Sequence, residues 1–211
     1  MHRQFILLLF AALLAGTPAS FSEQKTPKKS VYDFSLVDND GRTVSLSTYR
    51  GKVLLVVNLA SQSTYRDQIS ALNDLQNTYG PQGLVVLGIP SSDFGSKELT
   101  DPKAVRQYYG DKLHVAFPVF APAKTAGVEI IPLYSFLCDP KIGVPGGQLH
   151  WSFTKFIIGR DGIPLARYEV GEDPQGPAFH LIIEDALGGK LKKTDAIKID
   201  STAGDQEDRE D

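Results

Sequence analysis

The chain has 211 residues and a formal net charge of -3, with 22 Lys and Arg against 25 Asp and Glu. This length allows one domain with a substantial hydrophobic core and leaves too little chain for two. The weak negative charge argues against a nucleic-acid or anionic-membrane partner, and a disulfide-built fold is excluded because Cys138 is the only cysteine.

The N-terminus has the three-part pattern of a secretory signal peptide. A basic start leads into an apolar run from Phe5 to Ala15, which is followed by small residues. We expect a signal peptide over residues 1–19, cut after Ala19 or alternatively after Ser22, and a polar linker over residues 20–29. The apolar run has about half of the ~20 residues that a spanning helix needs, so no stable membrane anchor is expected. The predicted location is periplasmic or secreted.

Two short runs, Val31 to Val37 and Thr43 to Leu46, flank a turn that contains Gly41. Glycine supplies the positive φ that a tight turn needs, so these runs are predicted to form a β-hairpin. The next run, Val53 to Asn58, is apolar on both faces, which is typical of a central parallel strand.

A helix is predicted to follow this strand. Thr64 or Ser63 can cap it, and Asp67 lies in its first turn, where the helix dipole favours a carboxylate. Gly80 and Pro81 are expected to end it. Its buried face is predicted to consist of Tyr65, Ile69, Leu72, Leu75 and Tyr79.

The rest of the chain alternates between short apolar runs and helical segments. In chain order we expect a parallel strand over Leu84 to Ile89, a helix over Pro102 to Tyr109, an irregular segment over Phe117 to Ala126, helical turns over Ile131 to Leu137, a loop over Cys138 to His150, a hairpin of strands over Ser152 to Ile158 and Pro164 to Val170, and a helix over Pro177 to Leu187. This order matches an α/β, thioredoxin-like fold, in which helices flank a central mixed sheet and a β-hairpin precedes it. The domain is predicted over residues 30–189, and a polar, acidic, disordered tail over residues 190–211.

Four blocks of the sequence resemble the glutathione peroxidase family. They are Gly51 to Ser61, Pro90 to Gly95, Pro132 to Leu137 and Trp151 to Phe156. The first block is shared with other thioredoxin-like peroxidases and reductases, whereas the last two are much more specific in this order and spacing. Together the matches cover nearly the whole predicted domain.

The resemblance implies an activity and a site. Members of the family reduce hydrogen peroxide or lipid hydroperoxides at a cysteine or selenocysteine, which glutathione or thioredoxin then restores, with no metal or other cofactor. A glutamine, a tryptophan and an asparagine hold this nucleophile. In this sequence the nucleophile position falls on Ser63, the glutamine on Asp93, the tryptophan on Trp151 and the asparagine on Ser152. Only Trp151 keeps its family identity.

These substitutions remove the groups that the chemistry needs. Peroxide reduction requires a thiolate that can accept an oxygen as a sulfenic acid, and a serine hydroxyl is scarcely ionised at neutral pH. The Asp93 carboxylate accepts hydrogen bonds where the family has an amide that donates them. We therefore expect weak or absent peroxidase activity, with a noncatalytic exported binding module as the alternative.

Other roles for single residues stay open at this point. Ser63 can serve only as a helix cap, or it can be the nucleophile of a hydrolase with His150 and Asp93. Strand alternation argues against that hydrolase, because it would point His150 away from the face of Trp151. Cys138 can be a relocated peroxidatic thiol or simply a packed one.

Overall fold

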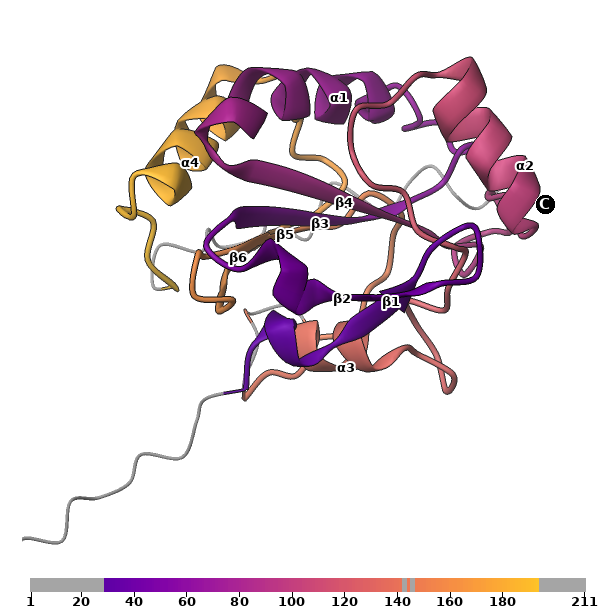
Figure 1. The fold of residues 1–211 in the computed structure, drawn as a ribbon, viewed down its shortest axis with the longest axis horizontal. Coiled ribbons are helices and arrows are strands. Elements are labelled where there is room, and N and C mark those ends of the chain that lie inside the picture. The colour runs from indigo at the N-terminus through magenta and orange to yellow at the C-terminus, as the bar shows by residue number, and fades with distance from the viewer. Residues whose placement is uncertain (1–28, 142–143, 145–146, 194–211) are drawn as a thin grey trace, which may run out of the picture.

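The computed structural model describes residues 29–141, 144 and 147–193. At its centre is a four-stranded sheet with the strand order β4-β3-β5-β6 (Figure 1). The strands are β3 (Val53–Leu59), β4 (Leu84–Pro90), β5 (Lys155–Ile158) and β6 (Pro164–Tyr168). β4 runs parallel to β3, whereas β5 is antiparallel to both β3 and β6, so the sheet is mixed as predicted.

Two helices cover one face of this sheet. α1 (Gln68–Tyr79) and α4 (Pro177–Leu187) lie side by side over it (Figure 1). Leu72 of α1 and Ile183 of α4 are fully buried in one core cluster with Val57 of β3. Alternate residues of a strand point to opposite faces, so the odd-numbered residues of β3 supply the sheet side of this cluster.

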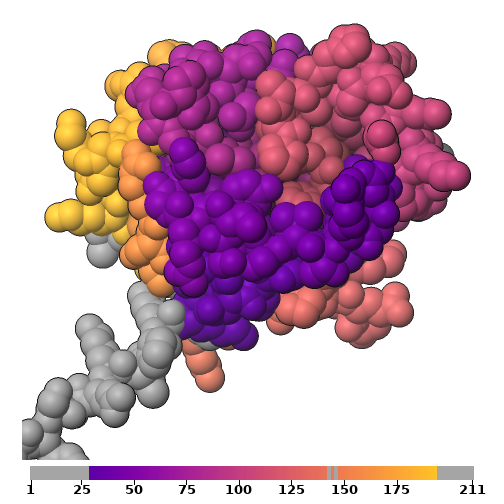
Figure 2. Space-filling model, in the orientation of Figure 1, coloured from indigo at the N-terminus to yellow at the C-terminus, as the bar shows by residue number. Residues whose placement is uncertain are grey.

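The opposite face is covered by the N-terminal hairpin and a short helix. The hairpin is formed by β1 (Ser35–Val37) and β2 (Thr43–Ser45), and the helix is α3 (Pro132–Leu137). Tyr134 of α3 packs edge-on against Phe156 of β5 within the second core cluster. The N-terminal segment that carries the hairpin lies across the molecular surface on this side (Figure 2).

Short helical segments make most of the connections. They are the 3₁₀ turns η1 (Val31–Asp33), η2 (Leu46–Tyr49) and η3 (Gly80–Gln82), and α2 (Pro102–Arg106), which continues into the π-helical segment η4 (Gln107–Lys112). Among the residues that the structure describes, no helix has the length and apolar character needed to cross a membrane.

Several predicted boundaries need correction. The first predicted strand begins only at Ser35, because residues 31–33 form a 3₁₀ turn in which the Asp33 carboxylate accepts a hydrogen bond from the Ser30 N–H at 2.8 Å. The helix predicted over Pro102 to Tyr109 is α-helical only as far as Arg106. By contrast, the helix over Pro177 to Leu187 is confirmed at both ends.

The predicted second hairpin is shorter than expected. Its first strand begins at Lys155 rather than at Ser152, because Phe153 adopts a left-handed backbone with φ of 61° that a strand cannot contain. Its second strand ends at Tyr168 rather than at Val170.

The predicted terminal segments fall largely beyond the described part of the chain. The signal peptide over residues 1–19, most of the linker and residues 194–211 of the tail lie outside the described residues. At the start of the predicted tail, Leu191 packs against the cluster formed by α1 and α4.

Candidate active site

Three chain segments meet at one edge of the sheet. The carboxyl ends of β3 and β4 lie there, and β5, which is antiparallel to β3, begins there. The Ser91 N–H donates to the Leu59 carbonyl at 3.0 Å, and the Phe153 N–H donates to the Asn58 carbonyl at 2.7 Å. The topology therefore brings to one edge the four residues singled out from the sequence, which are Ser63, Asp93, Trp151 and Ser152.

Ser63 lies in a turn, where its hydroxyl serves the backbone. The residue is only 5% exposed, and its Oγ accepts a hydrogen bond from the Tyr65 N–H at 3.2 Å. Because α1 begins at Gln68, the prediction that Ser63 or Thr64 caps this helix is wrong. The hydroxyl instead closes the turn before the helix, a contact that any polar turn residue can make and that does not activate a nucleophile.

The Asp93 carboxylate is held by the loop that precedes α3. Its Oδ2 accepts hydrogen bonds from the Thr125 N–H at 2.6 Å, the Ala126 N–H at 3.1 Å and the Ser91 hydroxyl at 2.8 Å, while its Oδ1 lies 3.0 Å from the Lys124 ammonium. Burial acts to raise the pKa of Asp93, but the Lys124 ammonium and the three donors outweigh it and hold that pKa below its ordinary value. Asp93 is thus an ionised anchor for this loop.

Replacing Asp93 by alanine is expected to lower the free energy of unfolding by about 2–3 kcal/mol, because its buried donors lose their acceptor. Asp93→Asn keeps one acceptor oxygen and should lose less. Since the folded pKa is depressed, the wild-type stabilisation is present above the ordinary value of 3.8 and is lost as the pH falls through the folded pKa. Urea unfolding at neutral and acidic pH measures both effects, and an alanine variant as stable as the wild type would contradict the anchoring role.

Trp151 and Ser152 lie in the turn before β5. The Trp151 carbonyl accepts hydrogen bonds from the Asn58 side-chain amide at 2.9 Å and from the Thr154 hydroxyl at 3.2 Å. The Trp151 ring is half-buried against the core cluster of α1 and α4, whereas Ser152 is buried. The turn is therefore fixed through the backbone of Trp151, while its side chain is only partly buried.

The hydrolase alternative finds no support in this geometry. Residues 151–153 form a turn, so strand alternation does not decide where the exposed His150 points. Within the described part of the chain, Ser63, His150 and Asp93 share no hydrogen bond with one another, and Asp93 is engaged elsewhere. A triad depends on such shared bonds and not on the presence of the three residue types.

A buried carboxylate behind the Ser63 turn was missed by the sequence reasoning. Glu98 is 5% exposed and accepts hydrogen bonds from the Ser61 N–H at 2.9 Å, the Ser61 hydroxyl at 2.5 Å, the Tyr109 hydroxyl at 2.5 Å and the Leu99 N–H at 2.6 Å. Burial raises the pKa of Glu98 although the Ser61 and Tyr109 donors oppose it. The Glu98 carboxylate thereby fixes Ser61, two residues before Ser63. The sequence around Glu98 does not distinguish it from a glutamate on an exposed loop.

Two buried cations were also missed. The Arg167 side chain is 1% exposed, lies 2.7 Å from a Glu169 carboxylate oxygen and donates to the Gly147 carbonyl at 2.6 Å. Lys155 is fully buried, and its ammonium donates to the Phe153 carbonyl at 3.0 Å. In the sequence, the burial of both side chains was indicated only by a charged residue within an otherwise apolar strand.

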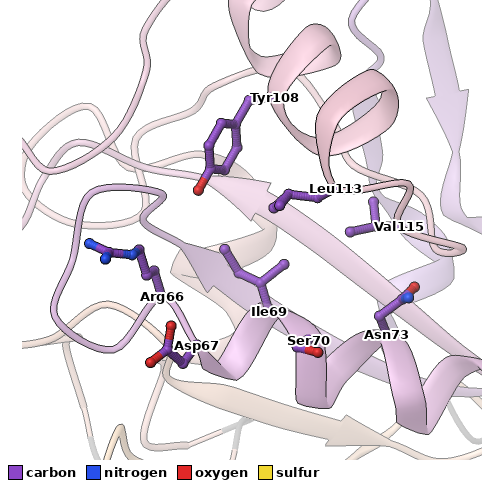
Figure 3. A pocket seen from close by; sticks show the side chains of 8 residues that line it. All are labelled: Arg66, Asp67, Ile69, Ser70, Asn73, Tyr108, Leu113 and Val115. Atoms are coloured by element: carbon purple, nitrogen blue, oxygen red, sulfur yellow. The ribbon is translucent and has the colours of Figure 1, made fainter.

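A cavity of about 240 Å³ adjoins the turn from the side of α1. It lies between the start of α1 and the end of η4, and the Tyr108 hydroxyl points into it (Figure 3). Its lining residues are Arg66, Asp67, Ile69, Ser70, Asn73, Tyr108, Leu113 and Val115. The Tyr108 hydroxyl also lies 3.4 Å from the Ser61 carbonyl, so the cavity borders the Ser63 turn without including any of the four predicted site residues.

Cys138 has the properties of a packed thiol. It follows α3, is 8% exposed and belongs to the core cluster on the hairpin side of the sheet. Burial raises the pKa of its thiol to about 11, although Arg167 and the Leu149 N–H oppose the increase. The thiolate fraction at neutral pH is therefore very small.

In the native protein, Cys138 is expected to react with a thiol-specific chromogenic disulfide reagent at least ~100-fold more slowly than a free thiol at the same pH, because its thiol is both buried and protonated. Addition of denaturant should bring the reaction to the rate of an ordinary cysteine. A fast, stoichiometric reaction of the native chain would restore Cys138 as a candidate reactive residue.

The sheet, its covering helices and the turn after β3 together define a thioredoxin-like protein, as predicted. The family model for glutathione peroxidase matches residues 31–138, which is about half of the chain. The chain belongs to the glutathione peroxidase family. The described residues contain no group of three or more His, Cys, Asp or Glu side chains placed to hold a metal ion.

Individual relatives support the same assignment. A glutathione peroxidase of Lactococcus lactis subsp. cremoris (strain MG1363) is 38% identical over 144 residues, which are 68% of this chain and 92% of the relative. The probable glutathione peroxidase 5 of Arabidopsis thaliana is 35% identical and covers 81% of this chain and 98% of its own. The crystal structure of T. cruzi GPX1 matches 76% of this chain and 97% of its own, with a TM-score of 0.60 at 30% identity. A thiol:disulfide interchange protein from Chlorobium tepidum TLS, with a TM-score of 0.55 at 22% identity, shares the fold.

Proposed function

We propose that this protein keeps the glutathione peroxidase fold, does not reduce hydroperoxides, and acts as a noncatalytic binding protein after export by its signal peptide. The proposal rests on Ser63, which stands where the family resemblance places the nucleophile and whose hydroxyl accepts a hydrogen bond from the Tyr65 N–H. In thiol-based reduction a thiolate attacks the peroxide bond, takes one oxygen as a sulfenic acid and releases water or an alcohol. A hydroxyl group has no corresponding oxidised state.

The neighbouring substitution supports the same conclusion. A developing anion at position 63 would need donors, but Asp93 is an acceptor whose oxygens are already occupied by Lys124, Thr125, Ala126 and Ser91. Apart from the Tyr65 N–H, this edge of the sheet thus lacks the side-chain donors at positions 93 and 152 that the family resemblance assigns to a thiolate site. Because these segments are held by hydrogen bonds but carry no reactive thiol, we favour a binding role over a catalytic one.

Steady-state turnover tests the proposal directly. The purified wild type and Cys138→Ser are each supplied with hydrogen peroxide or a lipid hydroperoxide and with glutathione or thioredoxin, and oxidation of the reductant is followed. Both proteins are expected to stay at the blank rate. Turnover that persists in Cys138→Ser would overturn the proposal, while turnover that only the wild type shows would identify Cys138 as the peroxidatic thiol.

A further inference from the structure

Lys155 is a fully buried amine within the core of the protein. It lies in β5 opposite Val57 of β3 and Tyr168 of β6, on the face that α1 and α4 cover. Its Nζ donates to the carbonyl of Phe153 at 3.0 Å and lies 3.4 Å from the main-chain carbonyl of Glu169. A buried lysine normally pairs with a carboxylate, so an ammonium group held by two main-chain carbonyls requires a specific explanation.

The Phe153 carbonyl belongs to the turn that carries Trp151. Phe153 has a φ of 61°, a conformation that a bulky residue adopts only when its surroundings enforce it. Its N–H is bonded to Asn58 of β3, and the Asn58 side chain is in turn bonded to the Trp151 carbonyl. Phe153 is thus bonded at both of its main-chain polar groups, through its N–H to Asn58 and through its carbonyl to the Lys155 ammonium.

We propose that Lys155 is the positioning residue of this turn: by joining the Phe153 carbonyl to the Glu169 carbonyl, it fixes the place of Trp151 at the edge of the sheet. This inference holds whether or not the protein turns over peroxide, because it concerns the presentation of Trp151 and not a reaction.

The position of Trp151 should therefore depend on pH. Burial lowers the pKa of Lys155 to about 7, although the surrounding carboxylates of Glu172, Glu169 and Asp173 oppose the decrease. The charge of an ammonium group strengthens its hydrogen bonds to the Phe153 and Glu169 carbonyls, whereas the neutral amine would make weaker ones. Above the pKa the turn is held less firmly, and the Trp151 ring gains access to solvent.

The protein contains its own reporter for this change, since Trp151 is the only tryptophan in the chain. Fluorescence of the full chain, excited selectively at tryptophan, is recorded as a function of pH together with quenching by acrylamide. We expect the emission to shift to longer wavelength and the quenching to increase as the pH rises, with a midpoint of about 7. Lys155→Met keeps the length of the side chain and removes the amine, so it should abolish the transition.

Two further variants distinguish positioning from a general effect on folding. Glu172→Gln leaves the hydrogen bonds of Lys155 intact and removes the carboxylate that most strongly raises its pKa, so the midpoint should move to lower pH. His150→Gln removes the imidazole next to Trp151 in the sequence without touching Lys155, and should leave the transition unchanged. A transition that persists in Lys155→Met or disappears in His150→Gln would overturn the proposal. If Lys155→Met fails to fold, an unmoved midpoint in Glu172→Gln would overturn it equally.

Discussion

Ser63→Cys is expected to give the protein a measurable reaction with hydrogen peroxide that the wild type lacks. The turn already directs the Tyr65 N–H at the side-chain atom of residue 63, so an introduced thiolate would have one donor in place. Because the residue is only 5% exposed, burial should otherwise raise the pKa of the new thiol and limit its reactivity. The rate should therefore be well above the blank and well below that of a complete site.

Restoring the missing donors should increase this rate stepwise. Adding Ser152→Asn and then Asp93→Gln to Ser63→Cys is expected to raise the second-order rate constant by roughly 10-fold or more for each donor that reaches the thiolate. Asp93→Gln also breaks the ion pair with Lys124, so Lys124→Met should accompany it to avoid an unpaired cation. Stopped-flow mixing with hydrogen peroxide measures the rate.

A matched control separates the site from the mere presence of a thiol. All variants carry Cys138→Ser, and Thr64→Cys places a thiol one residue away at an exposed position. This control should show only the slow reaction of an ordinary thiol. If Ser63→Cys is no faster than Thr64→Cys and the added donors change nothing, then the turn after β3 is not a peroxidatic site that has lost its nucleophile.

Removing the Glu98 carboxylate is expected to have the largest effect on stability. In Glu98→Ala, the Ser61 hydroxyl, the Tyr109 hydroxyl and the Ser61 and Leu99 N–H groups all lose their acceptor inside the protein. At about 1–3 kcal/mol for each buried group left unpaired, and with partial relaxation, the free energy of unfolding should fall by roughly 3–5 kcal/mol. Chemical denaturation at neutral pH measures this loss.

The controls for Glu98 follow from the same contacts. Tyr109→Phe removes one donor and leaves the carboxylate paired with Ser61 and Leu99, so it should cost only about 1 kcal/mol. Because the folded pKa of Glu98 is raised, protonation of Glu98 adds stability that is fully present below the ordinary value of 4.5, and this added part is lost as the pH rises through the folded pKa. Glu98→Gln should remove this pH-dependent loss. A Glu98→Ala variant no less stable than Tyr109→Phe would contradict the anchoring role.

The parts of the fold set by local patterns were predictable from the sequence. β3 is apolar on both faces because it is covered on both sides, and this pattern placed it within one residue of its observed end. α4 begins with Pro177 and is followed by Gly188, so both of its ends were marked by residues with strong backbone preferences. The order of such elements was sufficient to indicate a thioredoxin-like fold.

The parts set by tertiary contacts were not predictable. Capping preference placed the N-cap of α1 at Ser63 or Thr64, but the turn before the helix is held by contacts from distant residues, including the hydrogen bond from the Gln62 N–H to the Lys97 carbonyl at 2.9 Å. The left-handed backbone of Phe153 has no signature in a strand-like sequence. Likewise, neither the burial of Glu98 nor the ion pair of Asp93 with Lys124 can be read from residue type, because both depend on which loops meet in space.

The most direct test of the central claim is a single mixing of the wild-type protein with hydrogen peroxide in the absence of any reductant, followed by measurement of the peroxide that remains. A competent thiolate would consume about one equivalent per chain, since each thiolate accepts one oxygen to form a sulfenic acid. With Ser63 at the turn and Cys138 buried, we predict no consumption above the protein-free blank. Rapid loss of one equivalent of peroxide would contradict the claim that this member of the glutathione peroxidase family does not reduce hydroperoxides.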